Sequence, residues 1–347
     1  MSDICVVHLV WKPFGAGRLR EFVESYRRNP GGAPHRLVVA FNGFESEAEL
    51  GDYREALGGI RHESLFVRPP AQDIPAYFEA ARRLECEHLC FLNSHSRLID
   101  PEWLKKMYEH AAREDVGVVG ATGSWQSGYS FLLFEQGRPS AYTGLLDDYY
   151  CPDAAAKSGR FGLSEELLAH IRRKPFHRRL VSWPYCVAAG AAYSMRDRVK
   201  RRKEARAMLR QYSAEFEPFP ARHLRTNAFM IRRELMLRLR LAPITSKHDA
   251  HRFESGKEGM TSQVLRAGLR ALVVGRDGRA YEPDEWHLSE TLWQGEQRNL
   301  LVSDNQTDDY ARGGPRRRVF LSRVAWGDKA LPSASPRTSD AEASEGS

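Results

Sequence analysis

The chain has 347 residues, with 52 Lys and Arg against 45 Asp and Glu, which gives a formal net charge of +7. Because 42% of the residues are hydrophobic and 10% are aromatic, the chain can bury a core, and this excludes a wholly disordered protein. The 27 glycines and 18 prolines are ordinary numbers that exclude a collagen-like fibre. No run of the sequence reaches the roughly 18 apolar residues that a membrane-spanning helix needs.

The first 123 residues alternate between apolar segments of strand length and helical patterns. In chain order, we expect strands at 4–10, 36–41, 62–67, 88–92 and 116–121, separated by helices at 17–28, 45–57, 73–85 and from 100 onward. Strands that are apolar throughout and separated by helices are typical of a parallel sheet covered on both faces. Ligands of such sheets bind beyond the carboxyl ends of the strands.

The alternation is interrupted between residues 124 and 223, where aromatic residues and glycines are followed by basic clusters. It resumes with a strand at 226–231, helices at 233–241 and 259–267, and a strand at 271–275. We therefore expect an α/β domain made of residues 1–125 and 224–328, an insertion at 126–223 and a disordered tail at 329–347.

The cysteines and the chain start indicate a reducing compartment. Five cysteines are an odd number, and Cys86 and Cys90 lack the Cys-x2-Cys spacing of a zinc site, so we expect free thiols. Because Met1 to Asp3 leads directly into a strand-like segment, without an apolar signal segment, we expect a cytoplasmic protein.

Two enzyme classes are disfavoured by their missing motifs. Gly15 and Gly17 follow the first strand, but Arg20 stands at the third glycine position of a dinucleotide fingerprint, which argues against a Rossmann dehydrogenase or methyltransferase. No Gly-x-Ser-x-Gly is present, which argues against a Ser/His/Asp hydrolase.

The most informative segment is Phe91-Leu-Asn-Ser-His-Ser-Arg97, where an apolar strand ends in polar residues, followed by Asp100-Pro-Glu-Trp-Leu104. In this pattern the chain resembles the GT-A glycosyltransferases, particularly family-2-like bacterial enzymes. Those enzymes carry an apolar strand that ends in Asp-x-Asp, then a Pro and a Trp-Leu that opens the next helix. The resemblance implies a GT-A-like, Rossmann-like, mostly parallel sheet covered by helices.

By this resemblance, the segment binds the diphosphate of a nucleotide-sugar donor, where the family's acidic residues hold a divalent metal. Asn93 and His95 stand at the two acidic positions, with Ser94 between them. A neutral Asn and an imidazole make a poor Mg²⁺ site, although His is acceptable to Mn²⁺, so a divalent metal, Mn or Mg, stays open. Arg97 is a basic residue that could neutralise the charge of the diphosphate in place of a metal. Alternatively, Asn93 and Ser96 merely cap the turn and the helix start.

Further donor-site candidates lie at other strand ends and near the C-terminus. Trp11 and Lys12, after the first strand, are suited to stack on a uracil-type base and contact a phosphate, although an ordinary strand-end pair is equally open. Asn42 ends the second strand at the same expected edge. The resemblance makes His287 a candidate metal or diphosphate contact, against a solvated turn as the alternative, and we expect solvated turns over 304–310.

In inverting members of the family, an acidic residue that precedes a helix acts as general base on the acceptor hydroxyl. Here Lys247-His-Asp-Ala-His-Arg-Phe-Glu-Ser-Gly256 precedes the expected helix at 259–267. We rank Glu254 first and Asp249 second, whereas Glu258 fits a carboxylate that favours the helix macrodipole. The base must lie within hydrogen-bonding reach of the hydroxyl, which only a structure can decide.

The positive charge is concentrated in one part of the insertion. Residues 170–210 hold 13 Lys and Arg and 2 Asp and Glu, so the rest of the chain is mildly acidic. An uncharged segment with Trp183, Tyr185 and Tyr193 lies between the basic clusters. This pattern fits a peripheral contact with an anionic membrane surface, and a solvated basic helix beside a buried strand is the alternative.

We therefore expect a hexosyltransferase-like enzyme, cytoplasmic or peripheral at the inner face of the membrane. It would transfer sugar from a nucleotide-sugar to a glycan or lipid-linked acceptor in cell-surface polysaccharide or lipopolysaccharide synthesis. The missing Asp-x-Asp keeps open a non-catalytic GT-A-like protein that binds a glycan or a partner. Nucleic-acid binding is disfavoured, because the sequence has no zinc finger, RRM signature or helix-turn-helix pattern.

Overall fold

The computed structural model describes residues 4–69, 71–146 and 203–331. The described residues divide into two compact units, one formed by the segments up to Gly128 and from Glu215 onward, the other by residues between Tyr129 and Ala214. The uncharged segment at 180–195, most of the basic residues of 170–210 and the predicted tail beyond 331 lie outside the described residues.

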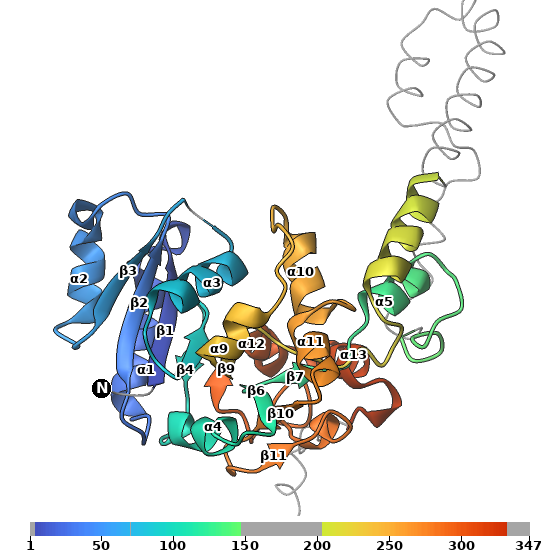
Figure 1. Ribbon diagram of the computed structural model, residues 1–347. Coiled ribbons are helices and arrows are strands. Elements are labelled where there is room, and N and C mark those ends of the chain that lie inside the picture. Colours follow the sequence, from blue (N-terminus) through green and yellow to red (C-terminus); the bar gives the residue numbers. More distant parts are fainter. Residues whose placement is uncertain (1–3, 70, 147–202, 332–347) are drawn as a thin grey trace, which may run out of the picture. The chain divides into compact units, whose positions relative to one another are not determined.

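An eight-stranded sheet forms the centre of the first unit, in the order β11-β10-β6-β9-β4-β1-β2-β3 (Figure 1). Strands β1 to β4 run parallel to one another, as do β6 and β10, whereas β9 is antiparallel to β4 and β6, and β11 is antiparallel to β10. The predicted mostly parallel α/β sheet is confirmed. The strands are β1 (Ile4–Trp11), β2 (Arg36–Asn42), β3 (Glu63–Val67), β4 (His88–Leu92), β6 (Val116–Gly120), β9 (Ala228–Arg232), β10 (Arg270–Val274) and β11 (Ala280–Tyr281).

Helices and short strand pairs surround this sheet in the first unit. The helices are α1 (Ala16–Arg28), α2 (Gly51–Leu57), α3 (Asp73–Arg83), α4 (Trp103–Ala111), α9 (Arg233–Arg238), α10 (Lys247–Ser255), α11 (Met260–Arg266), α12 (Asn305–Arg312) and α13 (Pro315–Trp326). Short antiparallel pairs join β5 (Arg97–Leu98) to β12 (Val302–Ser303) and β7 (Gly123–Ser124) to β8 (His223–Leu224). Single turns of 3-10 helix are η1 (Lys12–Phe14), η2 (Glu47–Leu50), η3 (Trp286–Leu288) and η4 (Gly327–Lys329).

Apolar side chains are buried on both faces of the sheet, which explains why its strands are apolar throughout. On one face, Val6 of β1 belongs to a buried cluster with Phe22 of α1 and Trp103 of α4. On the other face, the ring of Tyr77 in α3 lies 4.6 Å from that of Phe91 in β4, measured between centroids. The covered sheet leaves its strand ends as the place where polar side chains can meet a ligand.

Three local predictions differ from the structure. The helix after Asp100-Pro101 begins only at Trp103, because Glu102 adopts a left-handed conformation with φ of 60°. The segment that was expected to precede a helix is itself helix α10. The solvated turns expected over 304–310 are wrong, because Asp304 caps α12 by accepting hydrogen bonds from the N–H groups of Gln306 and Thr307.

The second unit contains most of α5 (Gly128–Glu135) and most of a helix over residues 203–215, which begins within the predicted basic segment. Tyr142 is buried there, with its ring centroid 6.0 Å from that of Phe131. Across the described ranges, no helix combines the length and the apolar character required to cross a bilayer.

Candidate functional site

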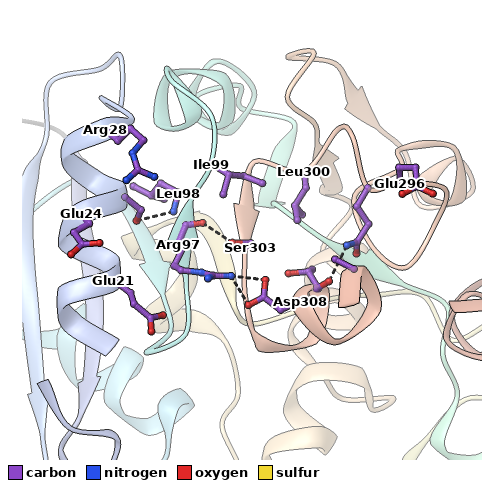
Figure 2. Close-up of a pocket in the computed structure, with 14 residues that line it drawn as sticks. Glu21, Glu24, Arg28, Arg97, Leu98, Ile99, Glu296, Leu300, Ser303 and Asp308 are labelled. Atoms are coloured by element: carbon purple, nitrogen blue, oxygen red, sulfur yellow. Dashed lines mark hydrogen bonds and ion pairs between the residues drawn. The ribbon is translucent and has the colours of Figure 1, made fainter. Parts of the chain in front are cut away.

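We call the predicted donor-binding segment, Phe91 to Arg97, the donor motif. A cavity of about 490 Å³ lies beside the end of this motif (Figure 2). Arg97 of β5 lines it and forms an ion pair with both carboxylate oxygens of Asp308 in α12. The volume suits a small molecule. However, the charged side chains of the lining include four carboxylates and only two guanidinium groups, which disfavours a diphosphate: Glu21, Glu24, Glu296, Asp308, Arg28 and Arg97.

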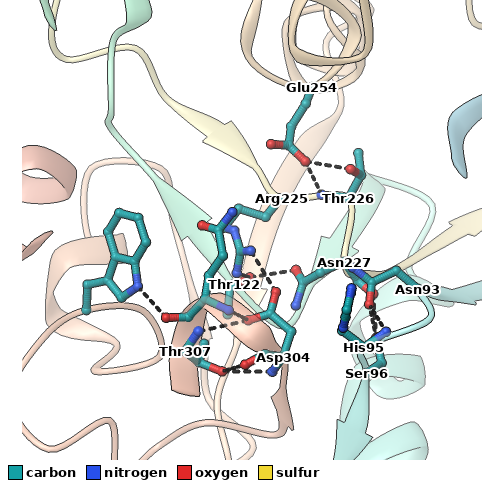
Figure 3. A network of polar contacts seen from close by, with 12 residues as sticks. Asn93, His95, Ser96, Thr122, Arg225, Thr226, Asn227, Glu254, Asp304 and Thr307 are labelled. Carbon is teal, nitrogen blue, oxygen red and sulfur yellow. Dashed lines mark hydrogen bonds and ion pairs between the residues drawn. The ribbon is translucent and has the colours of Figure 1, made fainter. Parts of the chain in front are cut away.

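A network of polar side chains lies at a different place, where the carboxyl ends of β4 and β6 meet the start of β9 (Figure 3). The backbone N–H of Asn93 donates to the carbonyl of Asn227 at 2.9 Å, and the hydroxyl of Thr122 donates to the Oδ1 of Asn227, also at 2.9 Å. Asn227 therefore joins the segments that follow two parallel strands. The predicted donor motif lies at this edge of the sheet.

The side chain of Asn93 shapes the turn of the donor motif. Its Oδ1 accepts a hydrogen bond from the N–H of His95 at 2.9 Å and lies 3.0 Å from the hydroxyl of Ser96. These contacts match the turn part of the capping alternative, whereas the next helix starts at Trp103 without a side-chain cap. The turn brings the imidazole of His95 against the half-exposed ring of Phe14 in η1, with 4.7 Å between the ring centroids.

Three buried polar atoms at this edge have no hydrogen-bond partner among the described residues: Ser94 Oγ, His95 Nδ1 and Asn227 Nδ2. Leaving a buried polar atom unpaired costs about 1–3 kcal/mol, so such atoms at neighbouring strand ends indicate a place where a ligand binds. Burial, assisted by the charge of Arg18, lowers the pKa of His95, so its imidazole is neutral at pH 7.

A buried ion pair anchors α12 to this network. Arg225 is 8% exposed and Asp304 is fully buried, with 2.7 Å between Nη2 and Oδ2. Burial alone would raise the pKa of the Asp304 carboxyl, but the charge and hydrogen bond of Arg225 outweigh it and the pKa is lowered. Arg225 also lies 3.5 Å from the hydroxyl of Thr122. Sequence reasoning missed both members of this pair, because residues 79 positions apart give no local signal.

Glu254 of α10 contacts Thr226, the residue that precedes Asn227 (Figure 3). Its Oε2 accepts hydrogen bonds from the N–H of Thr226 at 2.7 Å and from the Thr226 hydroxyl at 2.5 Å. Burial favours the neutral acid, but the charges of His223 and Arg225 and the Thr226 hydrogen bonds lower the pKa of Glu254. Within the described part of the chain, its Oε1 makes no hydrogen bond. The Glu254 side chain is therefore an oriented, ionised carboxylate with one oxygen that no described residue occupies.

The other two acidic candidates have structural partners instead. Asp249 completes the capping box of α10, where its Oδ2 accepts from the N–H groups of Thr245 and Ser246, and these bonds lower its pKa to about 2. Glu258 pairs with Arg266 at 2.7 Å on the surface. Of the three, Glu254 alone contacts the segment that leads into Asn227.

The remaining donor-site candidates are divided between the site edge and the scaffold. Trp11 ends β1 at the site edge, and Lys12 follows it with an ion pair to Glu49 at 2.9 Å. Asn42 is fully buried, and its carboxamide exchanges two hydrogen bonds with the backbone of Ala71, at 2.5 and 3.0 Å. This carboxamide therefore positions the loop that contains Ala71.

His287 and His95 are not brought together in the described structure. His287 lies in η3 and packs on Trp125, with 4.9 Å between ring centroids. In the described ranges, no group of three or more His, Cys, Asp or Glu side chains is arranged to hold a metal ion.

The residues at the predicted metal position do not fit a divalent ion. The side-chain oxygen of Asn93 and both carboxylate oxygens of Asp304 already accept hydrogen bonds from the protein. His95 Nδ1 is then left as an unpaired ligand atom, whereas Mg²⁺ requires several oxygen ligands and Mn²⁺ favours them.

Comparison with known proteins gives limited likenesses. No protein-family model and no curated protein sequence matches this chain. Among solved structures, it is similar to a mannosyltransferase from Pyrobaculum calidifontis in complex with GDP-Man and Mn²⁺, at 13% identity and a TM-score of 0.30 over 34% of this chain and 35% of that one. It is also similar to glucosyl-3-phosphoglycerate synthase from Mycobacterium tuberculosis in complex with Mn²⁺ and UDP, at 14% identity and a TM-score of 0.27 over 34% and 43%.

A further likeness is to TarS of S. aureus, at 14% identity and a TM-score of 0.26, covering 34% of this chain and 21% of that one. The chain thus spans less than half the length of each of these structures.

Proposed function

We propose that this protein is a glycosyltransferase that moves a sugar from a nucleotide-sugar donor to the hydroxyl group of an acceptor. The observation that carries the proposal is the position of Glu254. Its carboxylate is held by hydrogen bonds from Thr226. The next residue, Asn227, accepts a hydrogen bond through its carbonyl from the backbone N–H of Asn93 in the donor motif. The proposed base and the unpaired polar atoms proposed for the donor site therefore lie along one edge of the sheet.

In the proposed reaction, Glu254 takes the proton of the acceptor hydroxyl, and the acceptor oxygen forms a bond to the anomeric carbon of the donor sugar. The bond between that carbon and the phosphate oxygen breaks, and the nucleoside diphosphate leaves with the bonding electrons. A direct displacement of this kind inverts the configuration at the anomeric carbon. The proton remains on Glu254 until solvent removes it.

On the donor side, Ser94, His95 and Asn227 are proposed to contact the diphosphate, because each carries a polar atom without a partner in the described structure. Trp11 and Lys12, at the end of β1, are proposed to contact the base and a phosphate. Glu254 rather than Asp249 is proposed as the base, because the Asp249 carboxylate is occupied by the capping box.

The proposed acceptor is a glycan or a lipid-linked glycan, in cell-surface polysaccharide or lipopolysaccharide synthesis at the inner face of the membrane. Its support is the charge pattern of the sequence, which concentrates Lys and Arg in residues 170–210 around an uncharged aromatic segment.

A second candidate is a non-catalytic protein that binds a glycan through the same fold. The specific observation in its favour is that the acidic positions of the metal motif hold Asn93 and His95, and that the Asn93 oxygen is occupied by the turn.

A donor screen tests the proposal. Thermal shift with a panel of nucleotide-sugars selects the donor, and release of nucleoside diphosphate is then followed with and without glycan acceptors. Release that depends on an acceptor supports a transferase. Stabilisation by a glycan, with no release from any donor, supports the non-catalytic candidate.

A further inference from the structure

Among the described residues, no group of three or more His, Cys, Asp or Glu side chains is arranged to hold a divalent ion at the donor motif, so another source of positive charge is needed for a donor diphosphate. This inference rests on the proposed function, because a nucleotide-sugar donor is what brings a diphosphate to the site. Three arginines lie around the motif, and their partners decide which of them is available.

Arg225 and Arg97 are both committed to α12. Arg225 belongs to a buried pair with Asp304, and separating such a pair is strongly unfavourable because it leaves an unpaired buried charge. Arg97 meets both oxygens of Asp308 on the wall of the acid-rich cavity (Figure 2). Neither guanidinium therefore offers free positive charge to the motif.

Arg18 is the available arginine. It lies in the first turn of α1, and this first turn contains no acidic residue. The 3-10 turn η1 comes directly before it, and Phe14 of η1 contacts the ring of His95. Its ion pair with Glu21 spans 3.0 Å, and both side chains are exposed by more than two fifths, so the pair is weak. Together with burial, its charge lowers the pKa of His95, whereas the carboxylates of Asp304, Glu21 and Asp308 act on that pKa in the opposite direction.

We propose that this chain binds the diphosphate of its donor without a divalent ion, with Arg18 supplying the positive charge beside His95. The unpaired Oγ of Ser94 and Nδ2 of Asn227 supply neutral hydrogen-bond donors to the phosphate oxygens. A guanidinium group presents several N–H groups in a fixed geometry that matches phosphate, which allows it to replace a metal as the charge partner.

Calorimetric titration of the full chain with UDP and with GDP, in EDTA and in MnCl₂, tests this inference. We expect the affinity for the better-bound nucleotide to be the same within twofold in both buffers. Arg18→Gln should weaken binding in EDTA at least about tenfold, because it removes a charge-assisted hydrogen bond. Glu21→Gln should strengthen it about twofold, because it removes the competing carboxylate.

Arg20→Gln is the matched control, since Arg20 is exposed on the same helix and has no ion pair among the described residues. Binding that rises tenfold or more with Mn²⁺ would overturn the inference while leaving a nucleotide-binding transferase in place. Equal affinities of the Arg18 and Arg20 variants would overturn it as well.

If the Arg18 variant does not fold, the absence of any gain with Glu21→Gln decides against the inference. If neither nucleotide binds in either buffer, the inference fails together with the proposed donor.

Discussion

Thr226 contacts a single carboxylate oxygen of Glu254 through both its backbone N–H, at 2.7 Å, and its hydroxyl, at 2.5 Å. This double contact fixes a helix side chain to the segment that enters β9. The other carboxylate oxygen of Glu254 is left without a hydrogen bond in the described part of the protein. Because Thr226 precedes Asn227, the same short segment holds the proposed base in place and carries one unpaired donor-site atom.

The first prediction concerns the pH dependence of transfer. A general base works only when ionised, so the rate should fall as the pH drops through its pKa and stay level above it. The pKa of Glu254 is lowered by its neighbours, so activity should persist below the usual range of a glutamate. Thr226→Val removes one hydrogen bond to the carboxylate and should move the acidic limb of kcat/KM to higher pH.

Thr226→Ser keeps the hydroxyl and should retain the wild-type profile. A Val variant with an unshifted acidic limb would show that the Thr226 hydroxyl does not tune the base. Both profiles should be recorded only where circular dichroism shows the fold to be intact.

The second prediction concerns the buried ion pair. Asp304→Asn leaves the Arg225 guanidinium buried without its counter-charge, and it should lower the free energy of unfolding by about 3–5 kcal/mol. Urea unfolding measures this change. Asp309→Asn, on the exposed side of α12, should change it by less than about 0.5 kcal/mol. Similar losses for the two variants would argue against a special role of the pair.

The third prediction concerns donor binding. His95→Ala removes an unpaired imidazole from the strand-end network and should weaken UDP or GDP binding about two- to tenfold, with the melting temperature little changed. His62→Ala removes a histidine from the segment before β3 and serves as the control. Calorimetry compares the two, and unchanged affinity in the His95 variant would remove His95 from the site.

Much of this site edge was predictable from the sequence, because the end of an apolar strand is visible as a change of residue type. Phe91 to Arg97 shows such a change, and the structure places Asn93 and His95 just beyond β4. The parallel order of the first strands followed from their apolar character and from the helices between them. The position of Glu254 before a helix suggested its candidacy.

The long-range pairing was not predictable. Strand β9 enters the sheet between β4 and β6 in the antiparallel direction, which brings Asn227 next to Asn93 and Thr122. No local pattern encodes that partnership. A buried charge such as Asp304 looks like a turn residue in sequence, because its burial depends on Arg225, which is distant in the chain.

The most direct test of the account is the transfer rate of Glu254→Gln beside Glu258→Gln, measured as acceptor-dependent release of nucleoside diphosphate from the selected donor. The glutamine at 254 can still receive the Thr226 hydrogen bonds but cannot take a proton. We expect kcat to fall about 10²- to 10⁴-fold in this variant with donor affinity unchanged, and to stay at the wild-type value in the Glu258 variant. Full transfer activity in Glu254→Gln would contradict the assignment of Glu254 as the general base.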